Sequence, residues 1–107
     1  IAGRVPYCAS KFGVEALTQC LALEFQSYNI AVNSLSPGMH SILTDPEKLI
    51  QLKDNPSLVY LRPEIMVPPA LFLARQNGLG VTGQHLEATE WISQNNRGRI
   101  EDWRVTI

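Results

Sequence analysis

The chain has 107 residues, of which 45% are hydrophobic and 18% charged, and its formal net charge is -1. These values are typical of one small globular domain and exclude a disordered or fibrous chain. The near-neutral charge leaves no basic stripe for a phosphate backbone, so we expect no nucleic-acid partner. The longest apolar run, IMVPPALFLA, is too short to span a bilayer, and the N-terminus lacks a signal-peptide pattern. We therefore expect a soluble, cytoplasmic protein without a membrane partner.

The first predicted element is a long helix from Tyr7 to Tyr28. Apolar residues recur there at helical spacing on a wide face, and no proline interrupts them. These residues are Ala9, Phe12, Ala16, Leu17, Cys20, Leu21 and Leu23. Pro6 suits the first turn, and Asn29 can end the helix in a left-handed conformation. Because Cys8 and Cys20 lack the spacing of a metal site, we expect reduced, partly buried thiols instead of a disulfide or zinc site.

After this helix, strands and helices alternate along the chain. Short runs with β-branched residues, closed by glycine or proline, predict strands, and a capping residue followed by proline predicts a helix start. The pattern predicts a strand from Ile30 to Ser36 closed by Pro37-Gly38, a short helix from Asp45-Pro46 to Asn55-Pro56, a helix from Pro63 to Gln76 that Pro68 and Pro69 kink or split, and a strand from Gln84 to Ala88. The tail from Trp91 is mostly polar, and we assign no element to it.

This order of elements predicts an α/β fold. A strand, a connection that contains helices and a second strand form the pattern of a parallel sheet with a crossover. Two strands are fewer than a parallel sheet covered on both faces usually has. Because the first residue is Ile1, we also expect the chain to be the C-terminal part of a longer protein.

Four segments resemble the short-chain dehydrogenase/reductase family. YCASK, from Tyr7 to Lys11, resembles the family's Tyr-x-x-x-Lys active-site motif, and IAVNSLSPG resembles the strand and Pro-Gly turn beside the nicotinamide. RPEIMVPPALFLA and GVTGQHLEA are similar to a later proline-glutamate helix and to the last strand. The resemblance implies that residues 1–107 are a single partial domain, the C-terminal half of a Rossmann-like, doubly wound parallel sheet that binds NAD or NADP.

The resemblance also implies a role for each end of the Tyr-x-x-x-Lys motif. Tyr7 would exchange a proton with the substrate oxygen during hydride transfer between the nicotinamide and an alcohol or ketone. Residues four apart on a helix share a face, and an ammonium about 5 Å from a phenolate stabilises it by roughly 3 kcal/mol at an effective dielectric of 20. Lys11 would also bind the ribose hydroxyls of the cofactor. The alternative is an exposed tyrosine and a solvated lysine at a helix start.

The Pro-Gly turn supplies the other expected cofactor contacts. Gly38 lets the backbone approach a planar ring, and the resemblance implies that the main chain after the turn holds the carboxamide. Ile42 occupies the position where the family often has a threonine that helps to hold the carboxamide, so we expect no such side-chain contact from this position. His40 could contact cofactor or substrate, or be a solvated loop residue, and His85 has no family role and is expected to be structural. The expected cofactor-binding residues are Tyr7, Lys11, Pro37, Gly38, His40 and Ser41, and no metal site is expected.

The leading functional prediction is an NAD(P)-dependent oxidoreductase with Tyr7 and Lys11 as catalytic residues. The resemblance implies a small alcohol or carbonyl substrate and a homo-oligomer in the full-length protein. In the family, the catalytic serine and the glycine-rich phosphate turn lie upstream of the tyrosine, so we expect the 107 residues alone to be inactive. One alternative is a non-catalytic family member that binds nucleotide or serves as a scaffold. Another is an unrelated helical adaptor, against which the alternation in IAVNSLS speaks.

Overall fold

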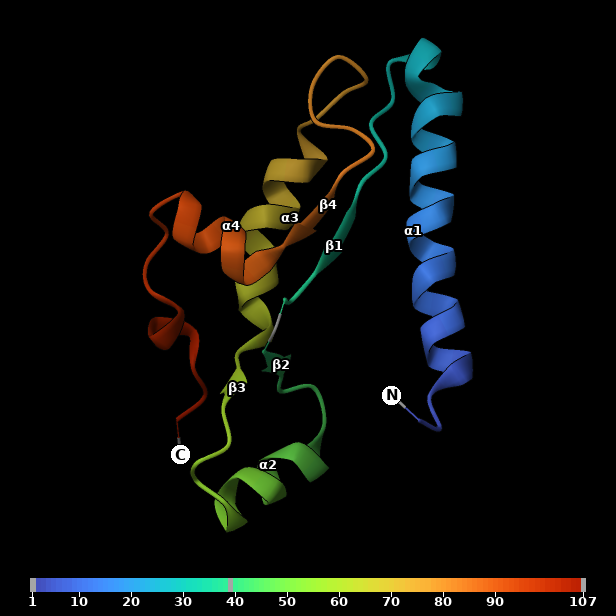
Figure 1. Ribbon diagram of the computed structural model, residues 1–107. Helices are drawn as coiled ribbons and strands as arrows, with labels where there is room; N and C mark the ends of the chain where they lie inside the picture. Colours follow the sequence, from blue (N-terminus) through green and yellow to red (C-terminus); the bar gives the residue numbers. More distant parts are fainter. Residues whose placement is uncertain (1, 39, 107) are drawn as a thin grey trace. The chain divides into compact units, whose positions relative to one another are not determined.

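The computed structural model describes residues 2–38 and 40–106, and Figure 1 shows its mixed α/β architecture. The helices are α1 (Val5–Phe25), α2 (Pro46–Asp54), α3 (Val67–Ala74) and α4 (Ala88–Gln94). The strands are β1 (Ser34–Ser36), β2 (Ser41–Ile42), β3 (Tyr60–Leu61) and β4 (His85–Glu87). Short 3-10 helices span Gln26–Tyr28, Pro63–Met66 and Ile100–Trp103. The expected alternation of strands and helices is therefore present, with two additional short strands.

The strands form two small sheets. β1 is the neighbour of β4, and β2 pairs with β3 in parallel, with Ser41 opposite Tyr60 and Ile42 opposite Leu61. Helix α2 lies between β2 and β3 in the sequence, as a parallel connection requires. The sequence did not predict β2 and β3, because a strand of two residues is too short to show an alternating pattern.

The chain divides into two compact units. Unit 1 contains Ile1–Ser34 and Phe72–His85, and unit 2 contains Leu35–Leu71 and Leu86–Ile107. The apolar core of unit 2 comes from the 3-10 helix after β3 and from α4, together with neighbouring segments. Its buried apolar residues are Leu52, Leu61, Ile65, Pro69, Ala88, Trp91 and Ile92. Unit 1 buries smaller side chains, among them Thr18 and Ala22 on α1.

Helix α1 begins and ends as the sequence predicted. Pro6 lies in its first turn, and after the 3-10 turn Asn29 adopts a left-handed conformation with φ of 57° and donates its N–H to the carbonyl of Gln26. Helix α1 is the longest helix, yet neither it nor any other helix within residues 2–38 and 40–106 is long and apolar enough to cross a membrane.

Much of the wide apolar face of α1 is exposed. Phe12 and Leu23 are 79% and 77% exposed. The helix buries small residues, and one of them, Ala22, faces the loop before β4, where a Cβ on Gly83 would lie 3.4 Å from the Cβ of Ala22. Cys8 is half-buried as expected, whereas Cys20 is exposed, and both thiols are free.

Strand β1 is shorter than the expected strand from Ile30 to Ser36. The backbone N–H of Val32 donates to the Thr82 hydroxyl at 3.0 Å, and the side-chain amide of Asn33 donates to the carbonyl of Val81 at 2.9 Å. Side chains thus make hydrogen bonds that a regular strand ladder would make through its backbone. One backbone hydrogen bond, from the N–H of Gly83 to the carbonyl of Val32 at 2.8 Å, is also present there, but the regular strand begins at Ser34.

The remaining helix predictions hold with small shifts. Asp45 caps α2, since its carboxylate accepts the N–H of Lys48 at 3.0 Å. The helix expected from Pro63 to Gln76 is split into a 3-10 turn and α3, whose first turn contains Pro68 and Pro69. Proline is tolerated in a first turn, because those amides have no helical partner. The unassigned tail contains most of α4 and a further 3-10 turn.

Candidate active site

Tyr7 and Lys11 lie one turn apart near the start of α1, in unit 1. The Nζ atom of Lys11 is 5.4 Å from the centroid of the Tyr7 ring, and both side chains are exposed, Tyr7 at 51%. The Ser10 hydroxyl donates to the carbonyl oxygen of Tyr7 at 2.7 Å. The structure therefore brings together the two residues that the sequence predicted as catalytic.

A second cation, which the sequence reasoning missed, lies beside the same ring. The guanidinium carbon of Arg4 is 4.5 Å from the centroid of the Tyr7 ring. Arg4 immediately precedes α1 and lies three residues before Tyr7, a spacing that brings side chains together on a helical turn. This three-residue spacing could have predicted the contact between Arg4 and Tyr7 from the sequence. Two positive groups thus lie beside one phenol ring.

The Pro37-Gly38 turn lies in unit 2, directly after β1. The backbone N–H of Thr89 donates to the carbonyl of Pro37 at 3.2 Å. Gly38 has a φ of 103°, and a Cβ at this position would overlap the Thr89 hydroxyl and lie 3.5 Å from Oε2 of Glu87. The fold itself therefore requires glycine here. This reason is separate from the one that the sequence suggested, which was the close approach of a planar ring.

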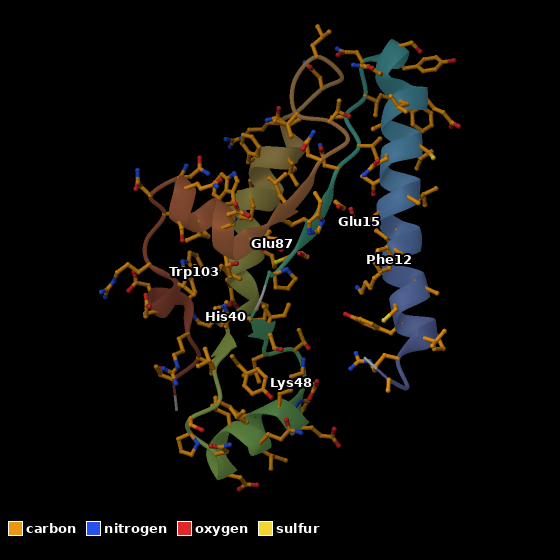
Figure 2. All side chains as sticks on the ribbon, viewed as in Figure 1. Phe12, Glu15, His40, Lys48, Glu87 and Trp103 are labelled. Atoms are coloured by element: carbon orange, nitrogen blue, oxygen red, sulfur yellow. The ribbon has the colours of Figure 1, made fainter. Side chains whose placement is uncertain are left out.

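His40 and Ser41 follow this turn, and both are exposed. Figure 2 labels His40 close to the start of β2. Ser41 opens β2, where it lies opposite Tyr60, and the neighbouring Ile42 accepts a hydrogen bond at its carbonyl from Nζ of Lys48 at 3.3 Å. Exposure leaves His40 and Ser41 able to meet a ligand, and it is equally what a solvated loop residue shows.

The expected site residues are thus shared between the two units. Tyr7 and Lys11 belong to unit 1, whereas Pro37, Gly38, His40 and Ser41 belong to unit 2. In the described part of the chain, no group of three or more His, Cys, Asp or Glu side chains could hold a metal ion. The donors at these positions are hydroxyl, ammonium and backbone groups.

Comparison with known proteins supports the resemblance of the sequence. A family model described as short chain dehydrogenase matches residues 1–53, which contain all six expected site residues. The chain is 41% identical over 90 residues to a 3-oxoacyl-(acyl-carrier-protein) reductase of Chlamydia pneumoniae, which covers 79% of this chain and 36% of the relative. A comparison with solved structures found no match.

Two further relatives are a bacterial dehydrogenase and an animal reductase. Fluoren-9-ol dehydrogenase from Terrabacter sp. (strain DBF63) is 31% identical over 104 residues, covering 94% of this chain and 29% of the relative. L-xylulose reductase from Caenorhabditis elegans is 33% identical over 96 residues, covering 83% of this chain and 38% of the relative. The chain spans about a third of the length of these relatives. The matches support its placement in the short-chain dehydrogenase/reductase family.

The crowding at Gly38 predicts that replacing Thr89 will partly restore the stability lost when Gly38 is replaced. Gly38→Ala should lower the free energy of unfolding by about 1–3 kcal/mol, because the new methyl meets the Thr89 hydroxyl and an L-residue is strained at this φ. Adding Thr89→Ala should recover part of this loss and leave the backbone strain. Urea unfolding of the full-length protein measures both effects. Equal stability of the single Gly38→Ala variant and the wild type would contradict the observed crowding.

Proposed function

We propose that this chain is part of an NAD(P)-dependent oxidoreductase that transfers hydride between the nicotinamide and a small alcohol or carbonyl compound. The observation that carries the proposal is the position of the Lys11 ammonium, 5.4 Å from the Tyr7 ring centroid at the start of a helix. The family match over residues 1–53 and the oxidoreductase relatives support the same chemistry. Residues 1–107 would then be the C-terminal half of a Rossmann-like domain.

Tyr7 is the general acid and base of this proposal. When bound, the nicotinamide supplies the hydride or accepts it, and charge then changes on the substrate oxygen. The Tyr7 hydroxyl gives that oxygen a proton in the reducing direction, and the Tyr7 phenolate takes a proton from it in the oxidising direction. Lys11 and Arg4 lie next to the ring and stabilise the phenolate that remains after the proton is given.

Lys11 has a second role in the proposal, as a ligand of the cofactor ribose. Its ammonium has three donors, and hydrogen bonds from a charged donor are stronger than those from a neutral one. The backbone after Pro37-Gly38 would hold the carboxamide, with His40 and Ser41 as exposed neighbours. Each of these contacts is proposed from the residue types and the family resemblance. We also propose that the full-length protein is a homo-oligomer and that it is cytoplasmic.

The role of Tyr7 predicts a large loss of turnover. In the full-length protein, Tyr7→Phe should lower kcat by about a hundredfold or more, with cofactor affinity nearly unchanged, because only the proton-transferring hydroxyl is removed. Tyr28→Phe is the matched control, since Tyr28 is an exposed tyrosine that follows the far end of α1. Steady-state kinetics of NAD(P)H oxidation compares the two variants, and normal turnover of Tyr7→Phe would refute the assignment.

The role of Lys11 predicts weaker cofactor binding. Lys11→Met should raise the dissociation constant for NADH or NADPH by about tenfold or more, because charge-assisted hydrogen bonds to the ribose are lost. Lys53→Met, in the last turn of α2, removes another exposed ammonium and should leave binding unchanged. Titration calorimetry on the full-length protein measures both. Unchanged binding in Lys11→Met would return this lysine to the role of a solvated side chain.

A further inference from the structure

A cluster of three polar side chains lies in unit 1, one helical turn beyond Lys11. The Ser34 hydroxyl donates to Glu15 and lies 2.9 and 3.0 Å from the two carboxylate oxygens. Nδ1 of His85 is 3.0 Å from Oε1 of Glu15 and 2.8 Å from the Ser34 hydroxyl oxygen. Ser34 is buried, while the side chains of Glu15 and His85 are 38% and 39% exposed. Figure 2 shows Glu15 on α1, pointing toward the start of β1.

The place of Glu15 in the sequence gives this cluster a relation to the candidate site. Glu15 is four residues after Lys11, and Lys11 is four residues after Tyr7, so all three share one face of α1. A carboxylate at this position attracts an ammonium one turn away. Yet in the described part of the chain no ion pair joins Lys11 to Glu15, and the lysine lies beside Tyr7 instead.

The carboxylate of Glu15 is already engaged. It can only accept hydrogen bonds when ionised, and Ser34 and His85 approach it from the starts of two neighbouring strands, β1 and β4. Ser34 is buried. Loss of its hydroxyl would remove one of the hydrogen-bond partners that the Glu15 carboxylate has on the strand side. The carboxylate would then be freer to turn along the helix face toward Lys11.

We propose that Glu15 is a positioning residue and that Ser34 and His85 hold its carboxylate away from Lys11. The Lys11 ammonium then stays available to Tyr7 and to the cofactor ribose. This inference rests on the proposed function, because it concerns the same lysine. A purely structural tie between α1 and the two strands would use the same contacts, but only in the positioning role does neutralising Glu15 restore cofactor binding once the Ser34 hydroxyl is removed.

The two roles separate in a set of variants of the full-length protein. Ser34→Ala should weaken NADH or NADPH binding by about two- to fivefold, the range expected when a partly exposed carboxylate competes for an ammonium. Adding Glu15→Gln should restore the binding, because the neutral amide cannot form the ion pair. Glu24→Gln removes another exposed carboxylate from α1 and should change nothing. Calorimetry gives the dissociation constants, and the unfolding midpoint is measured for every variant.

The outcomes distinguish this inference from the proposed function. If wild-type binding is saturable and is weakened in Lys11→Met, the proposed cofactor role holds. Under that condition, unchanged binding in Ser34→Ala, or a double variant that binds as weakly as Ser34→Ala, overturns the positioning role alone. Should Ser34→Ala fail to fold, His85→Leu removes the other partner of Glu15 at a part-exposed position, with the same expected loss and the same rescue by Glu15→Gln.

Discussion

The four-residue spacing on α1 is the constraint on which the candidate site depends. Helical geometry alone puts Tyr7, Lys11 and Glu15 on one face, in that order from the start of the helix. Pro6 fixes the helix start, so the phenol lies in the first turn, where the helix dipole favours negative charge. The lysine-tyrosine pair therefore needs no tertiary contact to form. The position of the Glu15 carboxylate, in contrast, depends on its contacts with Ser34 and His85 at the starts of β1 and β4.

Close backbone approach determines which side of α1 is covered in unit 1. A Cβ on Gly78 would lie 3.0 Å from both the Cα of Asn29 and the carbonyl oxygen of Gln26, so only glycine lets the loop pass the end of the helix. Farther along, Gly83 has a φ of 70°, and a Cβ there would lie 3.4 Å from the Cβ of Ala22, an ordinary contact distance. The contact uses small residues, and the larger apolar side chains of α1, such as Phe12, are left exposed.

Features with a repeating pattern could be predicted from the sequence, and contacts between distant residues could not. The helix from Tyr7 to Tyr28 was predictable because its period repeats over several turns, and the same spacing placed Lys11 beside Tyr7. Strand β3 was missed because two residues show no period. The contact of His85 with Glu15, and the Thr89 hydroxyl that fills the space beside Gly38, each join segments far apart in the sequence, so no local signal reports them.

The claim that Tyr7 and Lys11 act as one catalytic unit is tested most directly by a double-mutant cycle. Turnover at saturating cofactor is measured for Tyr7→Phe, Lys11→Met and the double variant of the full-length protein. If the lysine acts on proton transfer through the phenol, the double variant should be no slower than Tyr7→Phe within about threefold, since groups that act together are not additive. Losses that multiply across the two substitutions would contradict a shared role and leave the two residues acting independently.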